Sequence, residues 1–296
     1  MAAGFASLAP RSSLLVSRAL YHDDTVRLNE MKPLIETHDM DVSEEYFVGT
    51  CTHTHESEEM DSSAGRRLAW LRAMHKNGLR VKVATLDGER AGFLHVIPIE
   101  FCPWGPLGRD LLVIPCLVSV NKGHGVGEAL LVAAEEEARR QGRKGIVTIG
   151  YYHDFWFMPA SFFEANGFSK CGGAKAGYIN SKSRAAVLWR AFDEHAEAPV
   201  LLKPNYKFKP IQGHVVIELF WNAFCQTSNI EAQRVREVAA EFGDLVALNE
   251  YSTDDRPLLL GHQISRGIFI NGREIYWGYE APKDGIREAI TRALHG

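Results

Sequence analysis

The sequence lacks several features that would point to particular classes of protein. No apolar run approaches the roughly 20 residues that a membrane-spanning helix needs, so we expect no membrane association. The 5 cysteines are scattered and none forms a CxxC pair, which excludes a disulfide framework and suits a reducing compartment such as the cytoplasm. Lys and Arg number 33 against 37 Asp and Glu, giving a net charge of -4. This balance argues against a nucleic-acid binder, because phosphate affinity comes from clustered cations.

What is present is typical of a globular protein. The chain has 296 residues, 46% of them apolar, which is enough for two ordinary domains. The first 21 residues contain two arginines and several serines but no acidic residue, a composition weakly similar to an organelle transit peptide. Two arginines are few for such a peptide. We therefore interpret residues 1–26 as a flexible extension and expect a cytoplasmic protein.

The segment 27–194 has the pattern of a mixed α/β domain. Its expected elements are a helix, two strands around the turn Asp87-Gly88, a buried strand, a second helix and another buried strand, over residues 66–78, 79–99, 110–120, 127–142 and 144–150. The second helix has an apolar stripe and ends with arginines and a glycine. Continuous apolar runs on both sides of it indicate strands buried in a sheet.

A second, smaller α/β domain is expected at residues 211–296. Residues 195–210 contain three prolines and little periodicity, so they are interpreted as a linker. The pattern that follows is a strand, a helix, a strand, a hairpin on Asn271-Gly272 and a terminal helix.

Three alternating glycines in "VNKGHGVGEALL" (120–131) lie between a buried strand and a helix. Backbone N–H groups converge at such a turn and the helix dipole adds positive potential, so a phosphate or pyrophosphate ligand is the first hypothesis. A P-loop would need Gly-Lys-Ser/Thr, which Gly127-Glu128-Ala129 does not provide. A dinucleotide fingerprint would need its third glycine one position later.

The loop instead resembles the pyrophosphate loop of the GNAT superfamily of acyl-CoA N-acyltransferases, with Lys122 at the position where that loop usually has Arg or Gln. A second similarity lies in "SFFEANGF" (161–168), which looks like the family's "LYEKLGF". A helix and a strand lie between the two, in the family's order. The resemblance covers roughly residues 81–173.

The resemblance implies a mixed sheet whose central strands splay apart to hold acetyl-CoA or another acyl-CoA. The loop would hold the pyrophosphate through Lys122, Gly123, His124, Gly125, Val126, Gly127 and Glu128. The backbone of Leu117 and Val118 would lie along the thioester and pantetheine arm. The acceptor would be the amine of a small molecule. GNAT relatives often form dimers, so the resemblance is compatible with a homodimer, but the sequence does not settle the oligomeric state.

The catalytic groups depart from the family pattern. In many relatives the tyrosine of "LYEKLGF" donates a proton to the leaving thiolate, but this position is Phe163. Tyr151 and Tyr152 follow a strand at the end of the sheet where the thiol is expected, so either is a candidate donor or a wall of the acceptor pocket. Glu100 is a candidate general base, and His95 is another.

Two further sets of residues carry metal-binding or nucleophilic chemistry. Cys51, His53 and His55 have metal-ligand types at alternating positions, but no fourth ligand is nearby. We favour a polar loop and expect no metal. Cys116 lies in the strand next to the expected thioester, although a buried cysteine is usually a small apolar residue.

Cys225 lies between a strand and a helix in "WNAFCQTS", where the helix N-terminus would favour its thiolate. The order of elements from about residue 212 resembles a thioredoxin-like fold with a monothiol CxxS motif, and the whole chain after about Met31 resembles the YoaP-like acyltransferase family. Ser228 cannot resolve a mixed disulfide, and no proline precedes the hairpin, so dithiol chemistry is not expected. The sequence favours an N-acetyltransferase acting by direct attack. The alternatives are a thiol-handling protein that uses Cys225 or a non-catalytic CoA-binding module.

Overall fold

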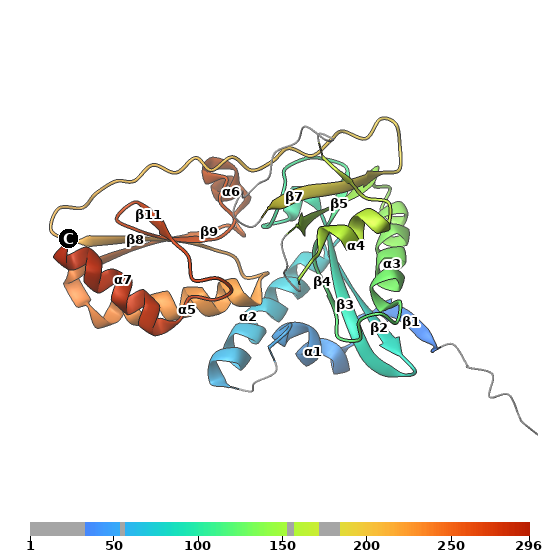
Figure 1. Cartoon of the computed structure of the whole chain (residues 1–296), viewed down its shortest axis with the longest axis horizontal. Coiled ribbons are helices and arrows are strands. Elements are labelled where there is room, and N and C mark those ends of the chain that lie inside the picture. Colours follow the sequence, from blue (N-terminus) through green and yellow to red (C-terminus); the bar gives the residue numbers. More distant parts are fainter. Residues whose placement is uncertain (1–32, 54–56, 153–156, 172–183) are drawn as a thin grey trace, which may run out of the picture. The chain divides into compact units, whose positions relative to one another are not determined.

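The computed structural model describes residues 33–53, 57–152, 157–171 and 184–296. These residues form two β-sheets, one of seven strands and one of four (Figure 1). The expected extension 1–26, with its weak resemblance to a transit peptide, lies outside the described residues. Within the described part of the chain, no helix combines the length and the apolar character that crossing a membrane requires.

The larger sheet has the strand order β1-β2-β3-β4-β5-β7-β6. Its strands are β1 (Ile35–Asp39), β2 (Arg80–Leu86), β3 (Glu89–Pro98), β4 (Leu111–Ser119), β5 (Gly145–Tyr151), β6 (Ser169–Lys170) and β7 (Ala185–Ala191). The expected turn joins β2 to β3, with φ of 52° at Asp87 and 86° at Gly88, as a tight hairpin requires. All neighbouring strands are antiparallel except β4 and β5. The mixed α/β class is therefore confirmed.

The two parallel strands separate halfway along their length. β4 pairs with β5 only from Leu111, opposite Gly145, to Ile114, opposite Thr148. The next residue of β4 is Pro115, which has no N–H to donate to the ladder. β4 then continues to Ser119 without β5, and its backbone on that side opens. The predicted splay of the central strands is present.

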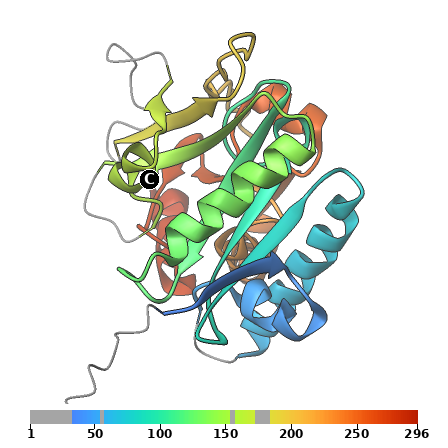
Figure 2. The same ribbon diagram turned by 90° about the vertical axis from the view of Figure 1, so that its right-hand side faces the viewer.

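Helices cover both faces of this sheet. On one face lie α1 (Glu45–Thr50) and α2 (Glu58–His75), whose apolar residues share a core with β2 and β3. On the other face lie α3 (Val126–Arg140) and α4 (Ala160–Ala165). Figure 2 shows α3 packed against this face of the sheet. The predicted stripe of α3 is buried, including Leu130 and Leu131, and each buried leucine contributes about 1.5–3 kcal/mol.

The smaller sheet has the order β11-β10-β8-β9. Its elements are β8 (Val215–Trp221), α5 (Gln226–Glu241), β9 (Val246–Ser252), α6 (Arg256–His262), β10 (Gly267–Ile270), β11 (Arg273–Ile275) and α7 (Lys283–His295). β8 and β9 are parallel, and the hairpin turns on Asn271-Gly272 as expected. Short 3-10 helices occur at η1 (Val42–Glu44), η2 (Ile99–Phe101) and η4 (Gly243–Leu245). The relationship of this sheet to thioredoxin-like proteins stays a prediction.

The predicted linker, residues 195–210, contains no helix. Its Val200 forms an isolated antiparallel bridge with Leu107, in which each backbone N–H donates to the other residue's carbonyl. Residues 33–296 form a single compact unit, in which Gln226 of α5 donates to Ser63 of α2 and Arg234 of α5 donates to Glu59 of α2. The division into domains at 27–194 and 211–296 stays a prediction.

Candidate functional site

The splayed half of β4 separates two cavities. A cavity of about 240 Å³ is lined by Leu117 and Val118, by the glycine-rich loop and by residues at the start of α4. A second cavity of about 510 Å³ is lined by Pro115 and Cys116 of the same strand, and by residues of the smaller sheet. Consecutive residues of one strand therefore contribute to both cavities, at the point where β5 no longer covers the strand.

The glycine-rich loop presents unpaired backbone N–H groups. Gly123 and Gly125 have φ of 81° and 85°, in the left-handed region that side chains disfavour. Gly125 precedes α3, and its carbonyl accepts from the N–H of Ala129. In the described part of the chain we find no acceptor for the N–H groups of residues 126–128. Together with the helix dipole they form an anion-binding end.

The third glycine has a different purpose. A Cβ at Gly127 would lie 2.9 Å from the ring of Phe162, so its absence lets α3 approach α4. A Cβ at Gly125 would make an ordinary contact, 3.4 Å from Ile35 Cδ1, and one at Gly123 would meet nothing within 4 Å. Two glycines therefore set the backbone of the loop, and one sets the packing of the helix behind it.

The structure brings most of the predicted cofactor-binding residues together. The small cavity is lined by Leu117, Val118, Lys122, Gly123, Gly125, Val126, Gly127 and Glu128. His124, the remaining predicted residue of the loop, is exposed and does not line it. Phe163, at the position of the family's tyrosine, is fully buried and lines this cavity with Phe162. Its phenyl ring has no proton to donate.

The large cavity is built by both sheets. The larger sheet and its helices contribute Cys51, Arg67, Trp104, Pro115, Cys116, Tyr151 and Phe157. The opposite wall consists of residues 224–227 and Glu231 at and just before the start of α5, residues 265–268 at the start of β10, and residues 274–279 in and after β11. Aromatic side chains are frequent on both walls. No single segment of the chain predicts this composition.

Arg67 is the most unusual residue of the large cavity. It is 1% exposed, and its Nη1 donates to the carbonyl oxygens of Val48, at 2.8 Å, and Gly49, at 3.4 Å. Its Nη2 lies 3.4 Å from Nε2 of His95, and its Nε has no partner. The Phe224 ring lies 5.6 Å from the guanidinium. Among the described residues no carboxylate forms an ion pair with this buried cation.

The groups around Arg67 respond to its charge. Burial and the guanidinium hold the pKa of His95 well below its ordinary value, so His95 is neutral. A hydrogen bond from the Cys116 thiol, together with the Arg67 and His53 charges, lowers the pKa of Cys51 to about 5 despite burial. The same hydrogen bond and burial raise the pKa of Cys116 well above its ordinary value. The charged form is therefore favoured at Cys51 and disfavoured at Cys116.

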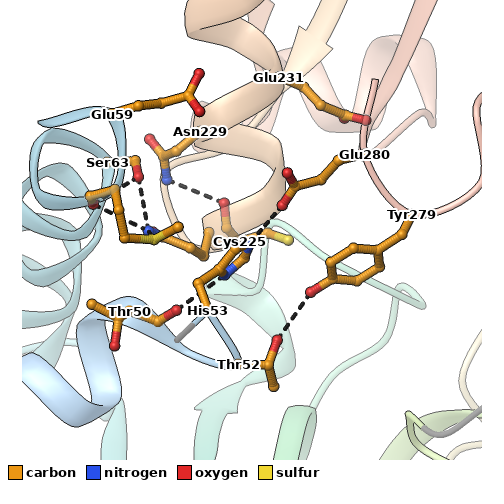
Figure 3. Close-up of polar contacts among 12 residues, drawn as sticks. Thr50, Thr52, His53, Glu59, Ser63, Cys225, Asn229, Glu231, Tyr279 and Glu280 are labelled. Atoms are coloured by element: carbon orange, nitrogen blue, oxygen red, sulfur yellow. Dashed lines mark hydrogen bonds and ion pairs between the residues drawn. The ribbon is translucent and has the colours of Figure 1, made fainter. Parts of the chain in front are cut away.

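His53 is a second basic group next to Cys51, and its charged form is favoured. Its Nδ1 lies 3.1 Å from the carbonyl oxygen of Thr50, and its Nε2 bonds the carboxylate of Glu280 (Figure 3). Burial opposes its charge, but the Glu280 carboxylate outweighs burial and raises the pKa of His53. Both ring nitrogens thus face acceptors. Figure 3 also shows Thr52 and Tyr279 meeting, with 3.1 Å between their hydroxyl oxygens.

Of the predicted catalytic residues, only Tyr151 lines one of the two cavities. Tyr151 lines the large cavity, and burial raises its pKa to about 12. Tyr152 lines neither cavity, and its hydroxyl donates to Glu164. Glu100 also lines neither cavity: it accepts from the Asp110 N–H at 2.7 Å and from Arg143 at 3.1 Å.

The sequence interpretation therefore misplaced Glu100. Register explains the error, because Pro98 pairs with Leu112 at the start of β4, whereas the cavities lie near the end of that strand. The structure gives Glu100 an ion pair with Arg143 at the opposite end of the strand.

The expectation that a helix N-terminus would favour the thiolate of Cys225 was also wrong. Cys225 does cap α5, but burial raises its pKa. The hydroxyl of Ser228 accepts from the N–H of Asn222 at 3.0 Å, so the serine of the CxxS motif is used in the turn. Cys225 nevertheless lines the large cavity.

Within the described residues, the possible metal ligands Cys51 and His53 belong to no cluster of three or more ligand-type side chains. Cys51 lines the large cavity and His53 pairs with Glu280, while His55 lies outside the described residues. In the described ranges, the only three ligand-type residues that gather closely enough are His38, Asp41 and Glu44. Their side chains already cap η1 and bond one another.

Sequence reasoning missed Arg67 altogether. A signal existed: Arg67 follows Ser63 and Ala64 and precedes Trp70 and Leu71 at helical spacing, and all five side chains are buried. An arginine in the apolar stripe of a helix indicates a buried charge that needs a partner.

Distant similarities to solved structures are found. A GNAT-family protein from Desulfovibrio desulfuricans is 16% identical over 54% of this chain and 100% of its own, with a TM-score of 0.41. A GNAT acetyltransferase from Brucella melitensis in complex with acetyl-CoA is 15% identical over 56% and 93%, with a TM-score of 0.36. The PaiA N-acetyltransferase from Thermoplasma acidophilum with coenzyme A is 13% identical over 53% and 99%, also at 0.36.

These TM-scores lie below 0.5, so the similarities establish no activity for this chain. No protein-family model matches the sequence, and no curated protein matches it either.

Proposed function

We propose that the protein is an acyl-CoA-dependent N-acyltransferase that moves an acyl group, acetyl in the simplest case, to the amine of a small molecule. The observation that carries this proposal is the pair of cavities beside the splayed half of β4. The small cavity ends at the unpaired N–H groups at the start of α3, and the large cavity is lined by aromatic side chains. A phosphate-bearing donor and an acceptor would meet at the strand between them.

The small cavity suits the cofactor. The pyrophosphate would lie on the N–H groups of residues 126–128, with Lys122 adding a positive charge at the mouth. The pantetheine arm would follow the backbone of Leu117 and Val118, as the sequence resemblance implies. The N–H of Leu117 has the thioether sulfur of Met158, at 3.2 Å, as its partner. A thioether is a weak acceptor, so a pantetheine amide carbonyl would replace it readily.

Tyr151 is the best placed proton donor for the leaving thiolate. It lines the large cavity at the end of β5, across the splay from Cys116. Because burial raises its pKa to about 12, the phenol stays protonated at neutral pH and can donate. It would supply the hydroxyl that Phe163 cannot.

The large cavity suits a small acceptor with apolar or aromatic character. Its volume of about 510 Å³ lies in the range of small-molecule sites. Aromatic side chains line it at Trp104, Phe157, Phe224, Tyr276, Trp277 and Tyr279. The carboxylate of Glu274 also lines it and would attract an amine, whereas that of Glu231 is paired with Arg266. The wall from the smaller sheet would set acceptor specificity.

The alternatives have less support. A thiol-handling role for Cys225 meets a raised pKa and a serine occupied by the turn. A module that binds CoA without turning it over would explain Phe163, but not the cavity and Tyr151 on the other side of β4.

Isothermal titration with acetyl-CoA, free CoA and a pantetheine without phosphates tests the proposal. Tight binding of the first two and weak binding of the third would support the pyrophosphate assignment. Amine acceptors would then be screened by following CoA release. Failure of all three compounds to bind would refute the transferase proposal. Binding without release of CoA to any amine or to water would favour the non-catalytic module.

A further inference from the structure

Cys51 has a strained backbone at the end of α1. Its φ is 60° and its ψ is −117°, values that residues other than glycine seldom adopt. Such conformations persist only where the surrounding structure holds them, and they cluster at active sites. A nucleophilic serine on a sharp strained turn is a known example of the same device. Here the strained residue lines the large cavity.

The buried charge of Arg67 needs a counterion, and among the residues that the structure describes no acidic side chain supplies it. A guanidinium that is 1% exposed is stable only when an anion balances it. Its partners are two backbone carbonyls and a neutral histidine, while Nε has none. The negative groups that act on it are the cysteines of the cavity, and Cys51 has the largest effect. A Cys51 thiolate therefore completes the charge balance.

The other groups that face Cys51 agree with this assignment. From β4, the Cys116 thiol donates to it, and beyond α1 His53 contributes a positive charge. From α5, Cys225 is held as the neutral thiol by burial. Arg266, also in this cavity wall, is paired with Glu231 at 2.7 Å. Of the three cysteines that line the cavity, only Cys51 has a lowered pKa.

We propose that Cys51 is a nucleophile that takes the acyl group from acyl-CoA as a protein thioester before the amine accepts it. The inference rests on the proposed function, and replaces direct attack with two steps. It assigns a catalytic role to a residue that the sequence placed in a polar loop.

The two steps balance without a redox partner. The Cys51 thiolate attacks the thioester carbonyl, a new C–S bond forms, and the bond to the CoA sulfur breaks, so CoA leaves as a thiolate. The neutral amine then attacks the Cys51 thioester and a C–N bond forms. Cys51 leaves as a thiolate, stabilised again by Arg67. Tyr151 gives its phenol proton to the CoA thiolate, and the amine proton restores the phenol. The products are the amide and CoA.

Trapping the acyl-protein tests the inference on the full-length chain. The protein is incubated with acetyl-CoA and no amine, and its intact mass and released CoA are measured. We expect one acetyl group per chain, released by hydroxylamine and mapped by peptide mass to Cys51, with one CoA released per chain. Cys51→Ser should lose both signals. Cys171→Ser, a half-buried cysteine outside both cavities, is the matched control and should keep both.

A second measurement tests the thiolate without acyl transfer. The rate of Cys51 alkylation by iodoacetamide, followed by peptide mass, should stay high down to a pH near 5. Cys116→Ala removes the hydrogen-bond donor and should move that transition to higher pH, whereas Cys116→Ser keeps a donor and should move it less. An alkylation transition at the ordinary thiol pKa of about 8.5 would overturn the assignment.

The outcomes separate the two proposals. If acetyl-CoA binds and amines are acylated, but no adduct forms and Cys51→Ser keeps full turnover, direct attack is the mechanism and only the nucleophile is refuted. If acetyl-CoA does not bind, the transferase proposal fails, and acyl transfer through Cys51 fails with it. An adduct that maps to Cys225 or Cys116 would also refute the role of Cys51.

Discussion

Replacing Gly125 by alanine tests the role of the loop most directly. The residue has a φ of 85°, and left-handed backbone costs a side-chain-bearing residue roughly 1–2 kcal/mol. A Cβ there would lie 3.4 Å from Ile35 Cδ1, an ordinary contact, so the cost is backbone strain and not a clash. If the loop relaxes to relieve the strain, the cost appears as lost affinity. We expect acyl-CoA to bind about 5–30-fold more weakly.

Gly88→Ala is the matched control for this substitution. Gly88 has a φ of 86° in the β2–β3 turn, and a Cβ there would meet nothing within 4 Å. Gly88→Ala should lose stability in urea titrations and bind acetyl-CoA as wild type does, whereas Gly125→Ala should bind acetyl-CoA more weakly in isothermal titration. Equal affinities for wild type and both variants would show that the conformation of the loop does not hold the cofactor.

Three further predictions concern catalysis and stability. Tyr151→Phe should lower kcat about 10²–10⁴-fold with little change in acetyl-CoA affinity, as a lost proton donor implies, whereas Tyr152→Phe should leave steady-state rates unchanged; equal effects would remove Tyr151 as the donor. Glu100→Gln should keep full turnover and cost no more than about 1 kcal/mol in urea, the value of a partly exposed ion pair, and a large loss of kcat would restore Glu100 as a base. Because the folded pKa of Cys51 is lowered to about 5, its stabilisation is complete above the unfolded pKa of about 8.5 and is lost as the pH falls toward 5. Urea titrations over that range should show that the free energy of unfolding decreases as the pH is lowered. The decrease should be smaller for Cys51→Ser, and an equal decrease in both proteins would refute a depressed pKa of Cys51.

Local signals predicted much of the fold. The turn at Asp87-Gly88, the apolar runs of β4 and β5, and the stripe of α3 each depend on residues close in sequence, and all appear near the expected positions. The elements that were missed are short or lack a clear period: β1, α1, β7 and α6. Their formation depends on neighbours that the chain supplies from elsewhere, since β7 is completed by pairing with β5.

Long-range contacts explain the two corrections. The sequence placed Glu100 near the site because it follows a strand next to β4, but the antiparallel register takes it to the other end. The sequence predicted a thiolate at Cys225 because the residue lies at the N-terminus of a helix, a local effect of a few tenths to about 1 kcal/mol. Burial in the cavity outweighs that effect and keeps the thiol neutral.

The sequence alone determined the glycine-rich loop, its place between β4 and α3, and thus a candidate phosphate site, because backbone conformation and helix dipoles are properties of adjacent residues. Only the tertiary structure decided the chemistry beside it. Cys51, Arg67 and Cys116 come from the end of α1, from α2 and from β4, and the charge of each depends on the other two. A pKa is set by burial and by charges a few ångströms away, and distances of that kind exist only once the chain has folded.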